Sequence, residues 1–418
     1  MASVFKQAVD YVKESLSAYT TVSGVATSDR VATNPLERSV EALNGRYNLG
    51  QTEVGEYIKF GVNDDFPIIL DKMLRQSPVH SGIVTKKAKM VTGKGIKYDF
   101  NSVKTPAKQA EIKAFLANCA GKSQGLYEQI VHSGFENEHK GGFAIYVKWN
   151  DDHTKPIEMR SLDIKGVRAA KPVGGKVTHY IIRRRFGTNM LSMQDNEPRL
   201  IPVFDKFKKN REEVLYVKNP YSGNEFYGVP NYISAYNYIA ADFEFGKHIH
   251  SSAKNGFSPK VLATFIGRNM TKEQQRDEFN KFKASFTGAE GETVIASWVK
   301  NKEDAPSFTP LDVSNLDKTV DVLSRLNDAK ILTAHNITSP TLFGVMVAGR
   351  LGGTGNELVG AYQIFRATET LPNRELVLSA YNRILSVAGY DKINLEIDEE
   401  IVNLESLKGA NTEDLTNG

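Results

Sequence analysis

Cysteine is almost missing from this sequence of 418 residues, in which Cys119 is the only one. A single thiol excludes an intrachain disulfide and a zinc site built from several cysteines. Long hydrophobic runs are missing too, because the longest uninterrupted apolar stretch covers only residues 342–349. A membrane-spanning helix needs about 20 apolar residues, so the sequence predicts no membrane span. The N-terminal pattern is amphipathic and contains acidic residues, so we expect no signal peptide and a soluble chain of a reducing compartment.

The composition predicts a folded chain with a substantial core. Hydrophobic residues make up 40% of the sequence, aromatic residues 10% and charged residues 24%. These fractions exclude a largely disordered protein, a collagen-like repeat and a disulfide scaffold.

The formal net charge is +4, but charge is distributed unevenly along the chain. Residues 176–211 carry nine Lys and Arg against three Asp and Glu, and they include the run Arg183, Arg184 and Arg185. From residue 391 onward there are eight acidic residues against two lysines. Such asymmetry permits a surface that faces a polyanion and an acidic tail, although a solvated face is the simpler interpretation of each.

Hydrophobic spacing predicts an α+β fold in the first half of the chain. A period near 3.6 favours helices at 65–75, 81–90, 105–120 and 125–139. A period of two then favours strands at 143–149, 176–186, 199–204 and 214–218.

The pattern changes after Pro230. Helical spacing extends from residue 229 to a helix end at Asn255 and Gly256. A compact insert follows, with strands at 259–266 and 293–298 and a helix opened by the capping-box pair Thr271 and Gln274. A second long helix, capped by Ser314 with Asp317, then returns. This order predicts a long helical hairpin with a small αβ module at its tip.

The last part of the chain combines a glycine-rich loop with a long helix. The loop covers residues 339–356, and helical spacing covers 357–388 with Pro372 inside it. Because proline removes a backbone donor and clashes with the preceding turn, we expect a kink there.

Motifs for chemistry are weak. The loop 349–356 leads into a helix, as phosphate-binding loops do, but it lacks the Lys-Ser/Thr of a Walker A motif and the spacing of a dinucleotide fingerprint. Two histidines and a carboxylate can hold zinc, but His132, Glu136 and His139 lack the H-E-x-x-H spacing of a metalloprotease and no further strong ligand is evident beside them. Cys119 has no neighbouring histidine, so a structural thiol is the simpler interpretation. The sequence predicts no catalytic residue, no metal site and no cofactor.

Four landmarks between residues 219 and 390 carry a family resemblance. They are a Tyr-Gly-Val-Pro turn at 227–230, Asn-Gly-Phe-Ser-Pro-Lys-Val-Leu at 255–262, the segment ILTAHNITSPTLFG at 331–344, and the glycine-rich loop that ends in Asn356 and Glu357. In this order and spacing they resemble the portal proteins, or head–tail connectors, of tailed double-stranded DNA bacteriophages. Two landmarks depart from the family pattern, since Val229 replaces a serine and Ile-Thr-Ser-Pro at 337–340 replaces Val-Pro-Pro.

The resemblance implies the phage portal fold: an αβ wing, a two-helix stem hairpin, a small αβ clip inserted at its tip and a long kinked wing helix. The implied parts are the N-terminal wing 1–225, first stem helix 226–257, clip 258–313, second stem helix 314–337, tunnel loop 338–358, long wing helix 359–390 and a short acidic C-terminal segment, or reduced crown, 391–418.

The resemblance also implies a function without catalysis. Portal proteins form a ring, usually a dodecamer, at one capsid vertex of the virion, and double-stranded DNA is packaged, retained and ejected through its channel without sequence specificity. The implied partners are the terminase large subunit, the major capsid protein and the head–tail adaptor or neck proteins, with assembly in the host cytoplasm and no membrane.

Three sets of residues follow from the resemblance. The DNA-facing tunnel loop would present Val345, Val347, Ala348, Arg350, Leu351 and Asn356. Packing of the stem between subunits would use Tyr232, Tyr236, Phe243, Leu323 and Leu326, and the clip would contain Phe279, Phe282, Phe286 and Trp298.

Several alternatives stay open. The stem residues could form the core of a single chain, and Arg350 could make an inter-subunit salt bridge instead of contacting phosphate. Two other functions compete with the portal: an enzyme that acts on nucleotides or nucleic acid through the loop 349–356, and another ring-forming head-completion component.

Overall fold

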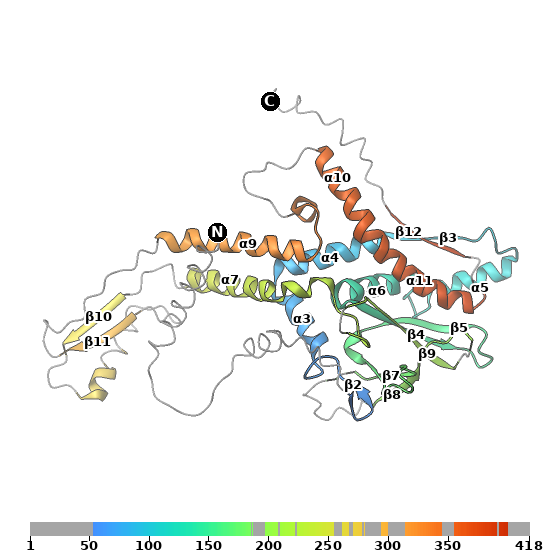
Figure 1. Ribbon diagram of the computed structural model, residues 1–418, viewed down its shortest axis with the longest axis horizontal. Helices are drawn as coiled ribbons and strands as arrows, with labels where there is room; N and C mark the ends of the chain where they lie inside the picture. The colour runs from blue at the N-terminus through green and yellow to red at the C-terminus, as the bar shows by residue number, and fades with distance from the viewer. Residues whose placement is uncertain are drawn as a thin grey trace, which may run out of the picture. The chain divides into compact units, whose positions relative to one another are not determined.

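The computed structural model describes residues 53–184, 186, 197–207, 210–221, 224–254, 261–266, 271–277, 280, 294–299, 314–344, 355–390 and 393–399. All of them belong to one compact unit, Asn48–Gly418. Figure 1 shows the arrangement of its elements.

The described elements mix helices and strands, as the sequence predicts. The α-helices are α3 (Phe66–Gln76), α4 (Pro78–Thr92), α5 (Pro106–Ala117), α6 (Leu126–Lys140), α7 (Tyr236–Lys254), α9 (Ser314–Ala334), α10 (Gly355–Phe365) and α11 (Leu371–Val387). The strands are β1 (Glu53–Val54), β2 (Tyr57–Ile58), β3 (Gly95–Asp99), β4 (Gly142–Trp149), β5 (Pro156–Leu162), β6 (Val167–Ala169), β7 (His179–Ile182), β8 (Arg199–Pro202), β9 (Glu212–Lys218), β10 (Val261–Ile266), β11 (Val294–Val299) and β12 (Asn394–Asp398).

The main core lies between a three-stranded antiparallel sheet and helices. The strand order is β5–β4–β9, and nearly every residue of the central strand β4 is buried. Helix α6 packs on β4 and β5, and α11 packs on α6 (Figure 1). Because side chains alternate along a strand, one face of β4 packs on the helices and the second face carries Tyr146. On that second face, Tyr146 lies under the guanidinium groups of Arg160 and Arg199.

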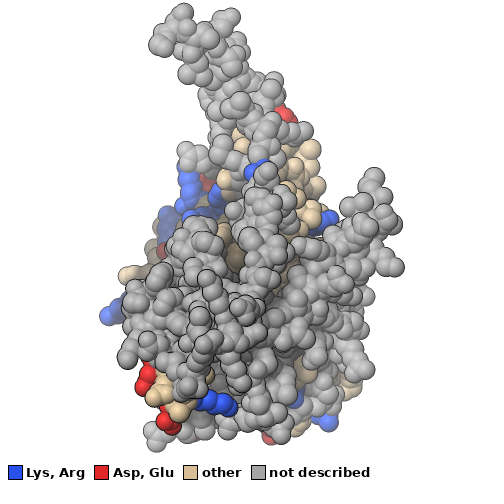
Figure 2. Space-filling view, turned by 90° about the vertical axis from the view of Figure 1, so that its left-hand side faces the viewer, with Lys and Arg blue, Asp and Glu red and all other residues tan. Residues whose placement is uncertain are grey.

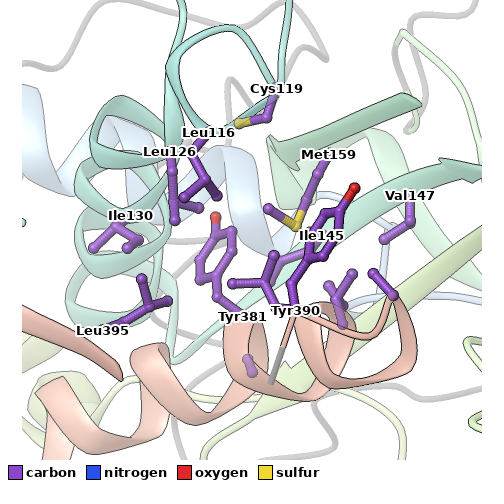
Figure 3. Packing of buried hydrophobic residues seen from close by; sticks show 14 of the residues in the cluster. Leu116, Cys119, Leu126, Ile130, Ile145, Val147, Met159, Tyr381, Tyr390 and Leu395 are labelled. Carbon is purple, nitrogen blue, oxygen red and sulfur yellow. The ribbon is translucent and has the colours of Figure 1, made fainter. Parts of the chain in front are cut away.

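Figure 3 shows the side chains that fill this core. Leu126 and Ile130 from α6, Ile145 from β4 and Tyr381 from α11 point toward one another. The Tyr381 hydroxyl donates to the backbone oxygen of Gln129 at 2.9 Å, so this buried polar atom is satisfied. Cys119 is buried, and burial raises its pKa to about 12, as is typical of a structural thiol.

The helices begin and end where short-range signals place them. Ser77 caps α4 by accepting a hydrogen bond from the backbone N–H of His80, and Pro78 occupies the first turn. The backbone N–H of Gly125 donates to the Glu128 carboxylate at the start of α6. Helix α6 ends at Gly141, whose φ of 74° lies in the left-handed region that favours glycine.

Strand β12 was not predicted. It pairs antiparallel with β3, and Leu395 enters the core cluster. The segment 391–418, expected to be a short acidic segment, therefore begins with a strand of the main body. Strands β1, β2, β3, β5 and β6 were not predicted either.

The long C-terminal helix is interrupted near Pro372 as expected, but by a π-helical segment that precedes the proline. Between α10 and α11 the residues Arg366–Thr370 form a π-helical segment, and Pro372 lies in the first turn of α11. Since proline has no N–H to donate, the ordinary hydrogen-bond ladder cannot pass through it, and a π-turn accommodates the gap. Arg366 and Arg374 both bind the Glu399 carboxylate, at 2.9 and 2.7 Å, which fixes the chain on both sides of the π-turn.

Candidate functional site: a helical hairpin and the ends of a glycine-rich segment

Helices α7 and α9 pack against each other as the predicted hairpin (Figure 1). The Asn327 side-chain amide on α9 donates to the backbone oxygen of Tyr238 on α7 at 2.9 Å, and Asn327 is buried. A buried amide bonded to the neighbouring helix fixes the register of the two helices, because sliding would leave it unsatisfied.

The surface of α9 carries an exposed apolar stripe. Val322 is 64% exposed, Leu323 42% and Leu326 50%. Spacings of three and four residues place these side chains on one side of the helix. We call these three residues the α9 stripe. Contiguous apolar surface of this kind marks an interaction site more often than an isolated exposed leucine does.

The residues predicted to pack the stem between subunits divide into two groups. Tyr232 and Tyr236 are buried within the single chain, which favours the alternative interpretation as core residues for these two. Phe243 is half-buried, with the Lys247 ammonium 4.4 Å from its ring centroid. Of the predicted set, Phe243 and the leucines of the α9 stripe have surface available to a partner.

The base of the hairpin is anchored to the body by a serine. Ser77 ends α3, caps α4 and also donates from Oγ to Oδ2 of Asp242 on α7 at 2.5 Å. One residue therefore connects three helices, because its backbone N–H bonds to Met73 of α3 while its hydroxyl bonds to α4 and α7. Because Ser77 is buried, its hydrogen bonds form in low dielectric, where they are stronger than at the surface.

Next to this anchor, three buried histidines surround Tyr232. His80 Nδ1 lies 2.9 Å from Nε2 of His335, the residue that follows α9, and the Tyr232 ring stacks on His335. The Tyr232 hydroxyl donates to the backbone oxygen of His139. Burial, with the charge of His139, lowers the pKa of His80 to about 3. Burial likewise holds the pKa of His335 well below its usual value, and that of His139 below it.

A buried ion cluster joins the end of the hairpin to the long C-terminal helix. Lys87 on α4 lies 3.2 Å from Glu138 on α6 and 3.0 Å from Glu369 in the π-helical segment. Although burial acts to lower it, attraction to the two carboxylates raises the pKa of Lys87. Asn336 donates to the other oxygen of Glu369 at 3.0 Å. We call Lys87, Glu138 and Glu369 the Lys87 cluster.

The two ends of the glycine-rich segment lie side by side. The Phe343 ring meets the Phe365 ring edge-on, with centroids 5.3 Å apart. The Thr338 hydroxyl donates to the backbone oxygen of Ala361, and Lys86 donates to that of Phe343 at 2.6 Å. Residues 338–343, before the glycines of the loop, thus contact residues 361–365, after it.

The family resemblance predicts six residues for the DNA-facing tunnel loop. Val345, Val347, Ala348, Arg350 and Leu351 lie outside the described residues, and Asn356 lies in the first turn of α10.

The insert at the tip of the hairpin contains the predicted short elements. Strands β10 and β11 pair in parallel, with Phe265 opposite Trp298 in register. The predicted capping box is confirmed, because the backbone N–H of Thr271 donates to the Gln274 side chain at 3.0 Å and the Thr271 hydroxyl accepts from the backbone N–H of Gln274. Of the predicted clip residues, Trp298 lies in β11, while Phe279, Phe282 and Phe286 are outside the described residues.

The histidines that could suggest zinc each have other partners. His132 lies 2.9 Å from Ser161, Glu136 accepts from Lys140 at 2.7 Å, and His139 donates to Asp71 at 3.1 Å. No group of three or more His, Cys, Asp or Glu side chains in the described part of the chain could hold a metal ion. Among the same residues, no helix is long and apolar enough to span a membrane.

Sequence reasoning missed the residues that anchor the hairpin. Ser77 followed by Pro78 is a recognisable helix start, and it could have been found. His80, Lys87, Glu138 and their partners give no local signal, because they meet from positions far apart in the sequence.

Figure 2 views the chain from the end at which β10 and β11 lie in Figure 1, and Lys and Arg side chains gather at the upper left edge of the described surface. Acidic side chains are visible mainly at other places in this view.

Comparisons with solved structures identify the fold. The chain is similar to a chain from the neck of a native GTA (gene transfer agent) particle, with a TM-score of 0.52 and 14% identity, covering 86% of this chain and 92% of that one. A chain from the neck of an empty GTA particle matches with a TM-score of 0.51 and 13% identity, covering 82% and 86%. The fold is that of a particle-neck chain. The resemblance to head–tail connectors predicted from the sequence is thereby confirmed at the level of the fold.

An HK97 family phage portal protein from Corynebacterium diphtheriae is also among the similar structures, with a TM-score of 0.41, 9% identity and coverage of 86% and 99%. No protein-family model and no curated protein matches this sequence.

Proposed function

We propose that this chain is a portal protein: a subunit of a ring-shaped channel at one capsid vertex, through which double-stranded DNA is packaged, retained and ejected. The observation that carries the proposal is the fold shared with a particle-neck chain over 86% of the length. The neck of that GTA particle was computed with C12 symmetry, and a ring of twelve copies is the corresponding expectation for this chain.

The hairpin would form the stem of the ring. In a ring, each stem must present apolar surface to its neighbours, and the α9 stripe offers such surface without a partner among the described residues of its own chain. The strands β10 and β11 with the short helix between them would form the clip, and the body with its two sheets would form the wing.

Weak binding to DNA is required of a channel through which DNA slides. Every phosphate that a protein neutralises adds salt-dependent affinity, so a channel wall dense in lysine and arginine would retain the DNA. On α7, Glu244 and Lys247 pair at 2.7 Å and balance each other. The glycine-rich segment, with one arginine per subunit at Arg350, would supply a sparse ring of positive charge that contacts phosphate without reading sequence.

Contacts at its two ends would support the glycine-rich segment. Because its two ends are held together by the Phe343–Phe365 contact and connected through Asn336 and Glu369 to the Lys87 cluster, the segment would project from a fixed base. The terminase large subunit, the major capsid protein and the neck adaptors would dock on the clip and the wing.

Electron microscopy of the purified chain, combined with native mass measurement, tests the proposal. We expect rings with a central channel and a mass near twelve copies. A chain that stays monomeric in the presence of its capsid and scaffold proteins, or that hydrolyses ATP in a manner abolished by Arg350→Ala, would contradict the portal role and favour the nucleotide enzyme.

A further inference from the structure

A pocket on the body remains outside the portal proposal. It lies between α3, the segment that joins β5 to β6, and the end of β7, and its volume is about 840 Å³. Six basic side chains line it: Lys72, Arg75, Arg160, Lys165, Arg183 and Arg184. The pocket thus includes two residues of the basic run that the sequence singled out, and that run has no role in the stem or the clip.

Three acidic residues line the pocket, Asp65, Asp71 and Asp163, and the last two already have close cationic partners. Asp71 accepts from Lys165 at 2.7 Å and from His139 at 3.1 Å, and Asp163 lies 3.0 Å from Lys140. Although burial opposes it, these partners hold the pKa of Asp71 below its usual value. Asp71 and Asp163 are therefore ionised and paired at neutral pH, which leaves Asp65 as the further carboxylate of the pocket against the remaining cations.

Three of those cations are exposed and make no direct ion pair, although Lys72 is attracted to Asp65. Among the described residues, Lys72, Arg75 and Arg184 make no hydrogen bond or ion pair, whereas Arg160 contacts Glu158 at 3.1 Å. A guanidinium group presents several N–H donors in a planar fork that matches a carboxylate. The rim of the pocket is therefore a set of unused donors for anionic groups.

The wall of the pocket is apolar. Leu162, Val167, Ile182 and Phe186 line it beside the charged rim, and Ile68 on α3 is partly exposed there. A phosphate backbone has no group to bury against such a wall, but a peptide carries apolar side chains next to its carboxylates. The volume lies within the range of about 300–1,000 Å³ that accommodates small ligands and short side-chain groups, and a DNA duplex cannot enter it.

We propose that this pocket is a docking site for an acidic protein segment, in which carboxylates bind the arginine rim and an apolar side chain packs on the inner wall. Charge complementarity selects the segment, and the apolar wall distinguishes it from nucleic acid. The site is independent of the channel, so its failure would leave the portal proposal untouched.

The test measures binding of a fluorescein-labelled peptide, capped Glu-Leu-Glu-Glu-Leu-Glu, to the full chain by fluorescence anisotropy. We expect saturable binding that Arg75→Glu with Arg184→Glu weakens by about a hundredfold, since losing each charge-assisted contact costs about tenfold. The peptide in which glutamine replaces glutamate should bind at least about tenfold more weakly for the same reason.

Matched variants separate this pocket from general surface charge. Lys122→Glu with Arg383→Glu reverses two exposed charges elsewhere on the body and should leave peptide affinity unchanged. If charge reversal in the pocket lowers the melting temperature, Arg75→Gln with Arg184→Gln replaces it as a milder change.

Three outcomes would overturn the proposal. The first is no binding of the peptide, and the second is binding that the pocket variants and the control variants weaken equally. The third is displacement of the peptide by a mixed-sequence DNA duplex that itself loses affinity in the pocket variants, because the site would then bind nucleic acid.

Discussion

The Lys87 cluster and the α9 stripe are opposites in their chemistry and in the partners they have. The cluster places three charged groups in the interior, where each is paired within the chain. The stripe places three apolar groups in solvent, where the described residues offer them no partner. Each is unfavourable for an isolated fold, since buried charges lose hydration and exposed apolar groups keep an unfavourable contact with water.

This comparison shows in which part of the molecule the side chains have their partners within a single chain. In the cluster, the cost of burial is offset by pairing that joins α4, α6 and the π-helical segment, so its function is internal. Among the described residues nothing offsets the exposure of the stripe, so we infer that its partner is another molecule. Substitutions at the two places should therefore separate stability from assembly.

The largest expected effect is on assembly. Leu323→Asp with Leu326→Asp places two charges in the α9 stripe, and a subunit interface that buries them would have to desolvate both. We expect rings to be lost altogether, while the melting temperature of the single chain changes little because both residues are exposed. Native mass spectrometry and differential scanning calorimetry measure the two quantities.

Val131→Asp provides the matched control for the stripe. Val131 is also an exposed apolar residue on a helix, but it lies on α6, away from the hairpin. This variant should assemble normally. Rings that form equally well from the stripe variant would show that the stripe is not the subunit interface.

The second effect is on stability. Lys87→Met removes the cation of the Lys87 cluster and leaves Glu138 and Glu369 buried without it. Removing one partner of a buried ion pair costs about 3–5 kcal/mol. We expect the free energy of unfolding, measured with urea under conditions that keep the chain monomeric, to fall by that amount.

Two further variants serve as controls for the effect of Lys87→Met on the free energy of unfolding. Lys122→Met at an exposed position should change the free energy of unfolding by less than about 0.5 kcal/mol. Adding Glu138→Gln and Glu369→Gln to Lys87→Met should restore part of the lost stability, because no unpaired charge then remains buried. A Lys87→Met chain as stable as the wild type would mean that the cluster contributes no net free energy.

The sequence predicted the elements that have local signals and did not predict contacts between residues far apart in the chain. Elements with local signals were found: the strand β4 from its alternation, the capping box from Thr271 and Gln274, and the hairpin from two long helical patterns. Strand β12 also alternates, with Leu395 and Ile397 on its inner face, but its acidic residues made the segment resemble a solvated tail. Charge bias concealed a pattern that a two-residue period would have revealed.

The anchors of the hairpin could not be predicted in this way. His80 and His335 are separated by 255 residues in the sequence and become neighbours only through the packing of α4 beside the end of α9. Tyr232 illustrates the same limit, because a helical pattern cannot distinguish a side chain that packs on its own chain from one that packs on a neighbour.

The smallest predicted effect is a dependence of stability on pH at the base of the hairpin. His80, His139 and His335 all have pKa values below the usual 6.5 in the folded chain, and burial is the first cause for each. Unfolding therefore takes up protons below pH 6.5, and each histidine removes up to about 1.4 kcal/mol of stability per pH unit there.

Glu136 acts in the opposite direction. Burial, against the attraction of Lys140, raises its pKa to about 7, so the folded chain holds this proton between pH 4.5 and 7 and gains stability as the pH falls. Burial also raises the pKa of Glu138, which acts in the same direction as Glu136. Three histidines outweigh these two glutamates, and we expect a net loss of stability between pH 7 and pH 5.5, measured by urea unfolding.

Replacing one histidine isolates the cause. His335→Gln removes one of the three groups, so its stability should depend less on pH by about 1 kcal/mol over the same interval. His179→Gln, at a partly exposed histidine of β7, should keep the wild-type dependence. A free energy of unfolding that increases as the pH falls from 7 to 5.5 would mean that the buried glutamates dominate. In that case the base of the hairpin would be more stable in acid, and the contrast between a fully paired interior and an unpaired α9 stripe would have to be drawn at each pH separately.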